Sequence, residues 1–156
     1  LDERGIDFAL SLSRVGDDGS VALFEEGYSL ALPRGHRLAG AKVVRGEDLA
    51  DDSMIVRTRC EVLSETSRHF TDRNVRPPLV YRTAQDERAL AMVGAGVGVT
   101  VMPDSYVADD VVRVSMAGFS PRRTVALFPP RFDLPERVRA AAEAFTRLAV
   151  DHFARR

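Results

Sequence analysis

The single cysteine, Cys60, is the residue whose type and position could do the most chemistry. It falls in the first turn of a predicted helix opened by a capping box, Thr58-x-x-Glu61, where free amides and the helix dipole favour a thiolate. The positive charges of Arg57 and Arg59 favour the thiolate form of Cys60 further. A half-buried thiol packing beside the apolar stripe 63–70 is the alternative. A redox role and a ligand-contact role for Cys60 both stay open, and we favour the interpretation that Cys60 only packs.

Two predicted helix starts could bind an anion. The segments Thr58–Glu61 and Thr83–Glu87 each follow a predicted strand directly. In open α/β sheets, ligands bind beyond the carboxyl ends of strands, and the free amides of a helix start can hold a carboxylate there. Ordinary caps formed by Thr58 and Thr83 explain the same residues. Capping and ligand binding are compatible, so both interpretations stay open.

The glycine-rich segment Gly94-Ala95-Gly96-Val97-Gly98 superficially suggests a phosphate-binding loop. Dinucleotide and Walker loops connect a strand to a following helix, whereas these glycines leave a predicted helix and enter a predicted strand. We therefore expect them to end the helix and to allow close packing.

No residue set completes a metal site or a catalytic triad. His36, His69 and His152 lie far apart without a metal-binding spacing, one cysteine cannot form an intrachain disulfide, and no GxSxG motif is present. We expect no metal, no cofactor and no enzymatic activity.

Length and charge limit the function classes. A chain of 156 residues allows one domain or two small lobes. Its net charge of -1 lacks the basic footprint of a nucleic-acid-binding module or a polybasic membrane patch. No apolar run approaches a membrane span. The chain begins with Leu1 rather than Met, so we expect a fragment of a longer protein, cytoplasmic by default.

Strand and helix patterns alternate along the chain and predict an α/β protein with largely parallel sheets. Alternating apolar residues predict a strand at 6–12, and further strands are expected at 21–24, 28–32, 53–57, 79–82, 97–102, 111–115 and 124–128. Helices are expected at 47–49, from Thr58 to a cap at Asn74, at 84–95 and 104–108, and after the cap Asp133-x-x-Glu136. The last helix carries one apolar stripe, from Val138 to Phe153.

Three segments together resemble the effector-binding domain of LysR-type transcriptional regulators. Residues 1–10, LDERGIDFAL, look like the family's L-x-x-G-x-L-D-x-A-L stretch. Residues 33–38, PRGHRL, look like its P-x-x-H-P-L turn, with Arg37 in place of the usual proline. Residues 93–103, VGAGVGVTVMP, look like its V-x-A-G-x-G-I-x-x-x-P signature. The order and spacing of the three motifs make the resemblance specific.

The resemblance implies a periplasmic-binding-protein-like (type II) fold of two α/β lobes joined by two crossover strands, with a small effector in the cleft. Lobe II would span residues 33–112, and lobe I residues 1–32 and 113–156. In this family, lobe I begins with a further strand-helix-strand-helix stretch, after an N-terminal winged helix-turn-helix that binds DNA. The first lobe is therefore expected to be incomplete, and part of the effector site is expected to lie outside this chain.

The resemblance also implies site residues. Family members place a polar residue at the start of the first lobe II helix, which here matches Thr58, Arg59 and Cys60. We predict effector contacts from these three and from Ser11, Gln85 and Thr100. Cys60 matches the reactive cysteine of peroxide-sensing members, but their partner cysteine corresponds to His69. That difference removes the intramolecular disulfide switch, although a sulfenic acid or mixed disulfide stays open.

The function that the resemblance implies is effector sensing in a bacterial transcription factor. The expected partners are an anionic or polar small molecule and a second copy of the chain, as a homodimer or homotetramer, with DNA contacted only through the absent N-terminal domain and no membrane partner. An extracytoplasmic solute-binding protein of a transport system is the alternative, and an enzyme on a similar scaffold is a third.

Overall fold

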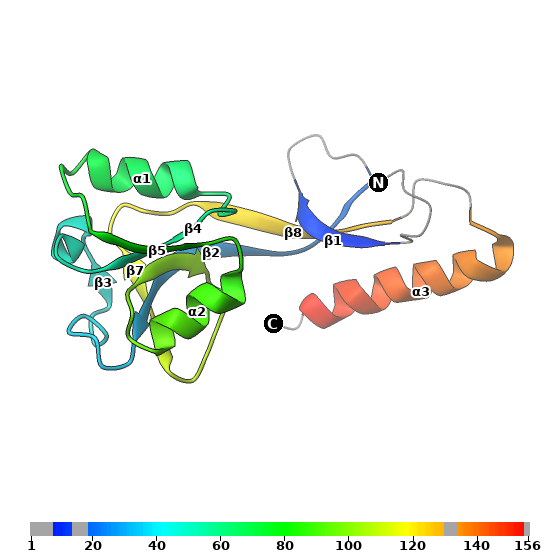
Figure 1. Ribbon diagram of the computed structural model, residues 1–156. Helices are drawn as coiled ribbons and strands as arrows, with labels where there is room; N and C mark the ends of the chain where they lie inside the picture. The colour runs from blue at the N-terminus through cyan, green and yellow to red at the C-terminus, as the bar shows by residue number, and fades with distance from the viewer. Residues whose placement is uncertain (1–7, 14–18, 130–133, 155–156) are drawn as a thin grey trace. The chain divides into compact units, whose positions relative to one another are not determined.

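The computed structural model describes residues 8–13, 19–129 and 134–154. Over these ranges strands and helices alternate, which confirms the predicted α/β class (Figure 1). The chain divides into two compact units: Leu1–Glu26 with Arg122–Arg156 (unit 1), and Gly27–Pro121 (unit 2). Within the described ranges, no helix is both long and apolar enough to cross a membrane.

Unit 1 is built on antiparallel strands and one long helix. Strand β1 (Ala9–Ser13) pairs with β8 (Arg122–Phe128), and β8 lies beside the first part of β2 (Val21–Pro33). Helix α3 (Glu136–Phe153) is attached through two aromatic contacts, Phe145 on Phe8 and Phe153 on Phe24, each with ring centroids 5.0 Å apart. Three apolar residues of α3 remain exposed, namely Val138, Phe145 and Leu148.

Strand β2 is continuous where two strands were predicted. It runs unbroken through Glu25, Glu26 and Gly27, so the prediction of separate strands at 21–24 and 28–32 is wrong. The reason is tertiary: Glu26 is buried and accepts a hydrogen bond from Arg123 on β8, with the ion pair at 2.7 Å. A charged pair that looks like a turn in the sequence is thus part of the sheet.

Unit 2 mixes parallel and antiparallel strands. The second part of β2 pairs antiparallel with β6 (Thr100–Pro103) and β7 (Val111–Met116), while β3 (Val43–Val44) pairs parallel with β7. Strand β4 (Met54–Arg57) pairs parallel with β5 (Leu79–Thr83), and a parallel bridge joins Met54 to Val99. The prediction of largely parallel sheets is therefore wrong, because hydrophobic periodicity carries no information on strand direction.

Helices α1 (Leu63–Thr71) and α2 (Asp86–Gly94) lie on opposite sides of β4 and β5 (Figure 1). Two core clusters follow the same division, one containing Met54 and Phe70, the other Ile55 and Val93. The short helix η1 (Gly46–Leu49) packs near α1. Residues 104–108, predicted as a helix, form a turn at 104–105 followed by irregular backbone, so that prediction is wrong. The predicted loop residues 16–18, the start of the first strand and the cap at Asp133 lie outside the described ranges.

The glycine-rich segment has the structural role that its sequence context predicted. Gly94 ends α2, and Gly96 has a φ of +76°, a left-handed conformation that glycine adopts without steric cost. A Cβ on Gly98 would lie 2.6 Å from the carbonyl oxygen of Ser53, at the point where Val99 donates its amide to the same oxygen. Close backbone approach, not phosphate binding, explains these residues.

We expect Gly98→Ala to lower the free energy of unfolding by about 2 kcal/mol, the usual scale for overpacking against a part that cannot move aside. Gly40→Ala is the matched control, since a Cβ there meets nothing within 4 Å. Urea unfolding of both variants measures the difference, and equal midpoints would contradict the proposed close packing at Gly98.

Candidate functional site

The polar edge of unit 2 lies where the parallel strands β4 and β5 end, at Arg57 and Thr83. Carboxyl ends of parallel strands share one edge of a sheet, where ligands commonly bind. Thr58 ties the two strand ends together, because its amide and its hydroxyl both donate to the Thr83 carbonyl oxygen, at 2.8 and 3.2 Å. The Thr83 hydroxyl in turn accepts the amide of Gln85, at 3.0 Å.

These bonds bring three of the predicted site residues together. Thr58 and Gln85 meet at Thr83, and the exposed Arg59 directly follows Thr58. Thr100 is buried and donates its hydroxyl to the Ile55 carbonyl oxygen, at 2.8 Å. Ser11 lies exposed on β1, in unit 1. The edge of unit 2 is therefore a candidate site built from Thr58, Arg59 and Gln85.

Helix α1 begins later than predicted. It starts at Leu63, after the cap residue Val62, and no side chain caps it, so the predicted capping box of Thr58 and Glu61 is wrong. The Thr58 hydroxyl is used by β5, and Glu61 accepts a hydrogen bond from the buried Tyr28 hydroxyl. These two anchors hold the segment before α1 in turns rather than in a helix.

Arg57 organises the interior of this edge. Its side chain is 2% exposed, and its Nε and Nη2 each donate to a carboxylate oxygen of Asp86, at 2.8 Å. Its Nη1 donates to the Val101 carbonyl oxygen at 3.1 Å and to the Cys60 sulfur at 3.4 Å. One guanidinium thus joins the end of β4, the start of α2, strand β6 and the segment before α1.

Cys60 is half-buried and is held inside this network. Burial raises the pKa of its thiol, and the neighbouring Arg57 charge and a hydrogen bond from the Val62 backbone offset this only in part. The expectation of a favoured thiolate is therefore wrong, because Cys60 precedes α1 instead of lying in its first turn. Arg57, Cys60 and Thr100 also line a cavity of only about 40 Å³, too small for an organic ligand.

His69, which matches the partner cysteine of the peroxide sensors, belongs to the core. It is buried with edge contacts to Phe70 and Phe119, and its Nε2 has no hydrogen-bond partner among the described residues. Burial lowers the pKa of its imidazole, and the nearby Arg73 charge acts in the same direction. His69 therefore packs as a neutral ring and supplies no redox partner.

Sequence reasoning used Arg57 only as a neighbour of Cys60 and missed both Asp86 and the ion pair between the two residues. Their signal was present as a lone cation ending the apolar strand 54–57 and an acidic residue opening the helix after the next strand. Across the described parts of the chain, no group of three or more His, Cys, Asp or Glu side chains could hold a metal ion.

The fold and this edge define an α/β domain of the periplasmic-binding-protein-like type II class. The family model of the LysR substrate binding domain matches residues 1–150, so the chain belongs to that family. No curated protein sequence matches the chain.

Solved structures agree with this assignment. A LysR family transcriptional regulator from Pseudomonas aeruginosa is 23% identical, with a TM-score of 0.68 over 94% of this chain and 51% of its own. The C-terminal domain of a LysR family regulator from Rhodococcus sp. RHA1 is 25% identical, with a TM-score of 0.68 over 92% of this chain and 74% of its own. The effector binding domain of QuiR, solved with shikimate, is 16% identical, with a TM-score of 0.68 over 96% and 72%. The chain thus spans about half the length of the first of these regulators.

We expect Asp86→Ala to lower the free energy of unfolding by about 3 kcal/mol, because it leaves the buried Arg57 guanidinium without its carboxylate. Because Asp86 is itself partly exposed, we expect a loss of stability at the low end of the range seen when one partner of a buried ion pair is removed. Glu87→Ala, the exposed neighbour on α2, is the control and should change stability by less than about 0.5 kcal/mol. Similar midpoints for the two variants in urea would show that the Arg57 pair stabilises nothing.

We expect Cys60 to react slowly at neutral pH. Because burial raises its pKa above the ordinary value of 9.0, the thiolate fraction at pH 7 is below that of a free cysteine and grows only as pH rises through 9 and beyond. Iodoacetamide labelling followed by mass spectrometry across pH 7–10 measures this, with the urea-unfolded chain as control. Rapid stoichiometric dimedone trapping after micromolar peroxide would contradict it and favour a redox role.

Proposed function

We propose that the chain is the effector-sensing domain of a LysR family transcription factor. Membership in the LysR substrate binding domain family carries this proposal, and the solved QuiR effector binding domain with shikimate supports it. Binding would shift the population of domain conformations, and DNA would be contacted by a segment outside this chain. The net charge of -1 suits a domain that makes no DNA contacts of its own.

We further propose that unit 1 and unit 2 correspond to the two lobes of this family, with β2 as one crossover strand. The role that we propose is binding rather than catalysis, because Cys60, the nucleophilic side chain of the edge, is engaged by the Arg57 guanidinium. A regulator of this kind acts in the cytoplasm, and we propose that it does so as a homodimer or homotetramer.

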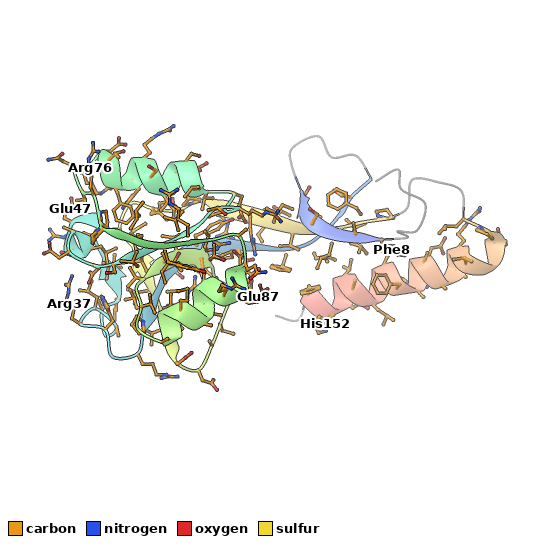
Figure 2. The ribbon with its side chains drawn as sticks, in the orientation of Figure 1. Phe8, Arg37, Glu47, Arg76, Glu87 and His152 are labelled. Atoms are coloured by element: carbon orange, nitrogen blue, oxygen red, sulfur yellow. The ribbon has the colours of Figure 1, made fainter. Side chains whose placement is uncertain are left out.

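The effector contacts are proposed at Thr58, Arg59 and Gln85. Asp86 and Glu87 place two carboxylates in the first turn of α2, where Figure 2 labels Glu87. These negative charges already offset the partial positive charge at the N-terminus of that helix. Arg59 is exposed at the same edge, and none of the hydrogen bonds and ion pairs found among the described residues involves it. An anionic group on the effector is therefore expected at Arg59 rather than at the amides of α2.

The test is binding of small hydroxylated carboxylates, shikimate among them, measured by calorimetry on the parent protein, so that the part of the effector site expected outside this chain is present. We expect at least one to bind, and Arg59→Ala to weaken it more than about tenfold, or 1.4 kcal/mol. Arg68→Ala, an exposed arginine on α1, is the matched control and should leave the affinity unchanged. Unchanged affinity in Arg59→Ala removes Arg59 from the site, and absence of binding across the set contradicts the proposal.

A further inference from the structure

A second, larger hollow lies in unit 2 on the α1 side of β4 and β5. Its volume is about 440 Å³, within the range of small-molecule sites. We call it the α1–β5 groove. Its apolar wall is formed by Met54, Val56, Leu63, Phe70, Val75 and Leu79. Leu79 remains 54% exposed and Leu63 37% exposed, so the groove presents apolar surface that a ligand could cover.

The charges of the groove all have one sign. Arg76 and Arg82 are its two charged lining residues, and no acidic residue lines it in the described part of the chain. Both side chains are exposed, and neither has a hydrogen-bond or ion-pair partner among the described residues. Elsewhere in unit 2, Arg37, Arg45 and Arg57 each pair with an aspartate. The two groove arginines thus leave uncompensated positive charge beside an apolar wall.

The two arginines lie at opposite ends of the groove. Arg76 comes after the carboxyl end of α1, where Figure 2 labels it. Arg82 precedes Thr83, which is bonded to Thr58 just before α1 begins. The nine residues of α1 give the groove a length of about 13 Å, at 1.5 Å per residue. An extended apolar chain with an anionic head matches this length and this charge.

We propose that the α1–β5 groove is a second binding site, separate from the effector edge, for an organic anion with an apolar body such as a medium-chain carboxylate. The carboxylate pairs with one of the two guanidinium groups, and the apolar body covers Leu63, Phe70 and Leu79. Arginine is suited to this task, since its planar fork can hold a carboxylate through two hydrogen bonds. Burial of the exposed leucines supplies the apolar part of the affinity.

The chain contains no tryptophan, so a single introduced tryptophan reports on one position only. Leu79→Trp places the reporter in the groove, and Val80→Trp is the matched control, the next residue of β5 and similarly exposed but not a lining residue. We expect octanoate to shift the emission of Leu79→Trp to shorter wavelength with saturation, and to leave Val80→Trp unchanged. An equal shift in both variants, or no shift in either, overturns the proposal.

Charge is tested in the Leu79→Trp chain. Octylammonium should give no saturable shift, and Arg76→Gln with Arg82→Gln should weaken octanoate about tenfold, whereas Arg88→Gln on α2 should not. Equal binding of octylammonium overturns the anionic assignment. If the emission of Leu79→Trp shifts with protein concentration in the absence of octanoate, a second copy of the chain occupies the groove, and the proposal is overturned. Loss of octanoate binding in Arg59→Ala would assign the probe to the effector edge and overturn a separate site.

Discussion

The buried guanidinium of Arg57 is the constraint on which the candidate site depends. A charge with almost no contact with water must have its donors satisfied inside the protein, and here the Asp86 carboxylate, the Val101 carbonyl and the Cys60 sulfur accept them. Each acceptor comes from a different segment of unit 2. Because Arg57 bonds to all of these segments at once, its burial holds them together and so positions the edge residues.

That arrangement decides which polar groups remain available to a ligand. The Cys60 sulfur accepts a hydrogen bond from Arg57, and the amide and hydroxyl of Thr58 both donate to the Thr83 carbonyl oxygen. Arg59 is left exposed between them. Three consecutive residues that look equivalent in the sequence therefore have three different environments: Thr58 links two strands, Arg59 is exposed, and Cys60 packs against Arg57.

Much of the fold follows from local patterns, and the departures have identifiable tertiary causes. The strands at 54–57, 79–83 and 111–116 and the role of the 94–98 glycines were predictable, since alternation, capping and backbone approach act over a few residues. The start of α1 was not, because Thr83 and Tyr28, both distant in sequence, hold Thr58 and Glu61. The edge position of Thr58 and Arg59 was predictable from strand order. The Arg57–Asp86 pair was not, since its partners are 29 residues apart.

Arg113 on β7, like Arg57 on β4, donates hydrogen bonds to several segments at once. It donates to the Ser29 hydroxyl and to the Met102 and Tyr106 carbonyl oxygens, while Ser29 donates to Asp104, at 2.6 Å. Only one of the 22 cations in the chain is a lysine, Lys42, and these two positions give part of that preference a physical basis. An ammonium carries its three donors on one nitrogen, whereas a planar guanidinium spreads five donors over three nitrogens and can bridge acceptors that lie farther apart. At Arg57 and Arg113, therefore, one arginine links several segments through hydrogen bonds, and a lysine would keep the charge but lose part of these bonds.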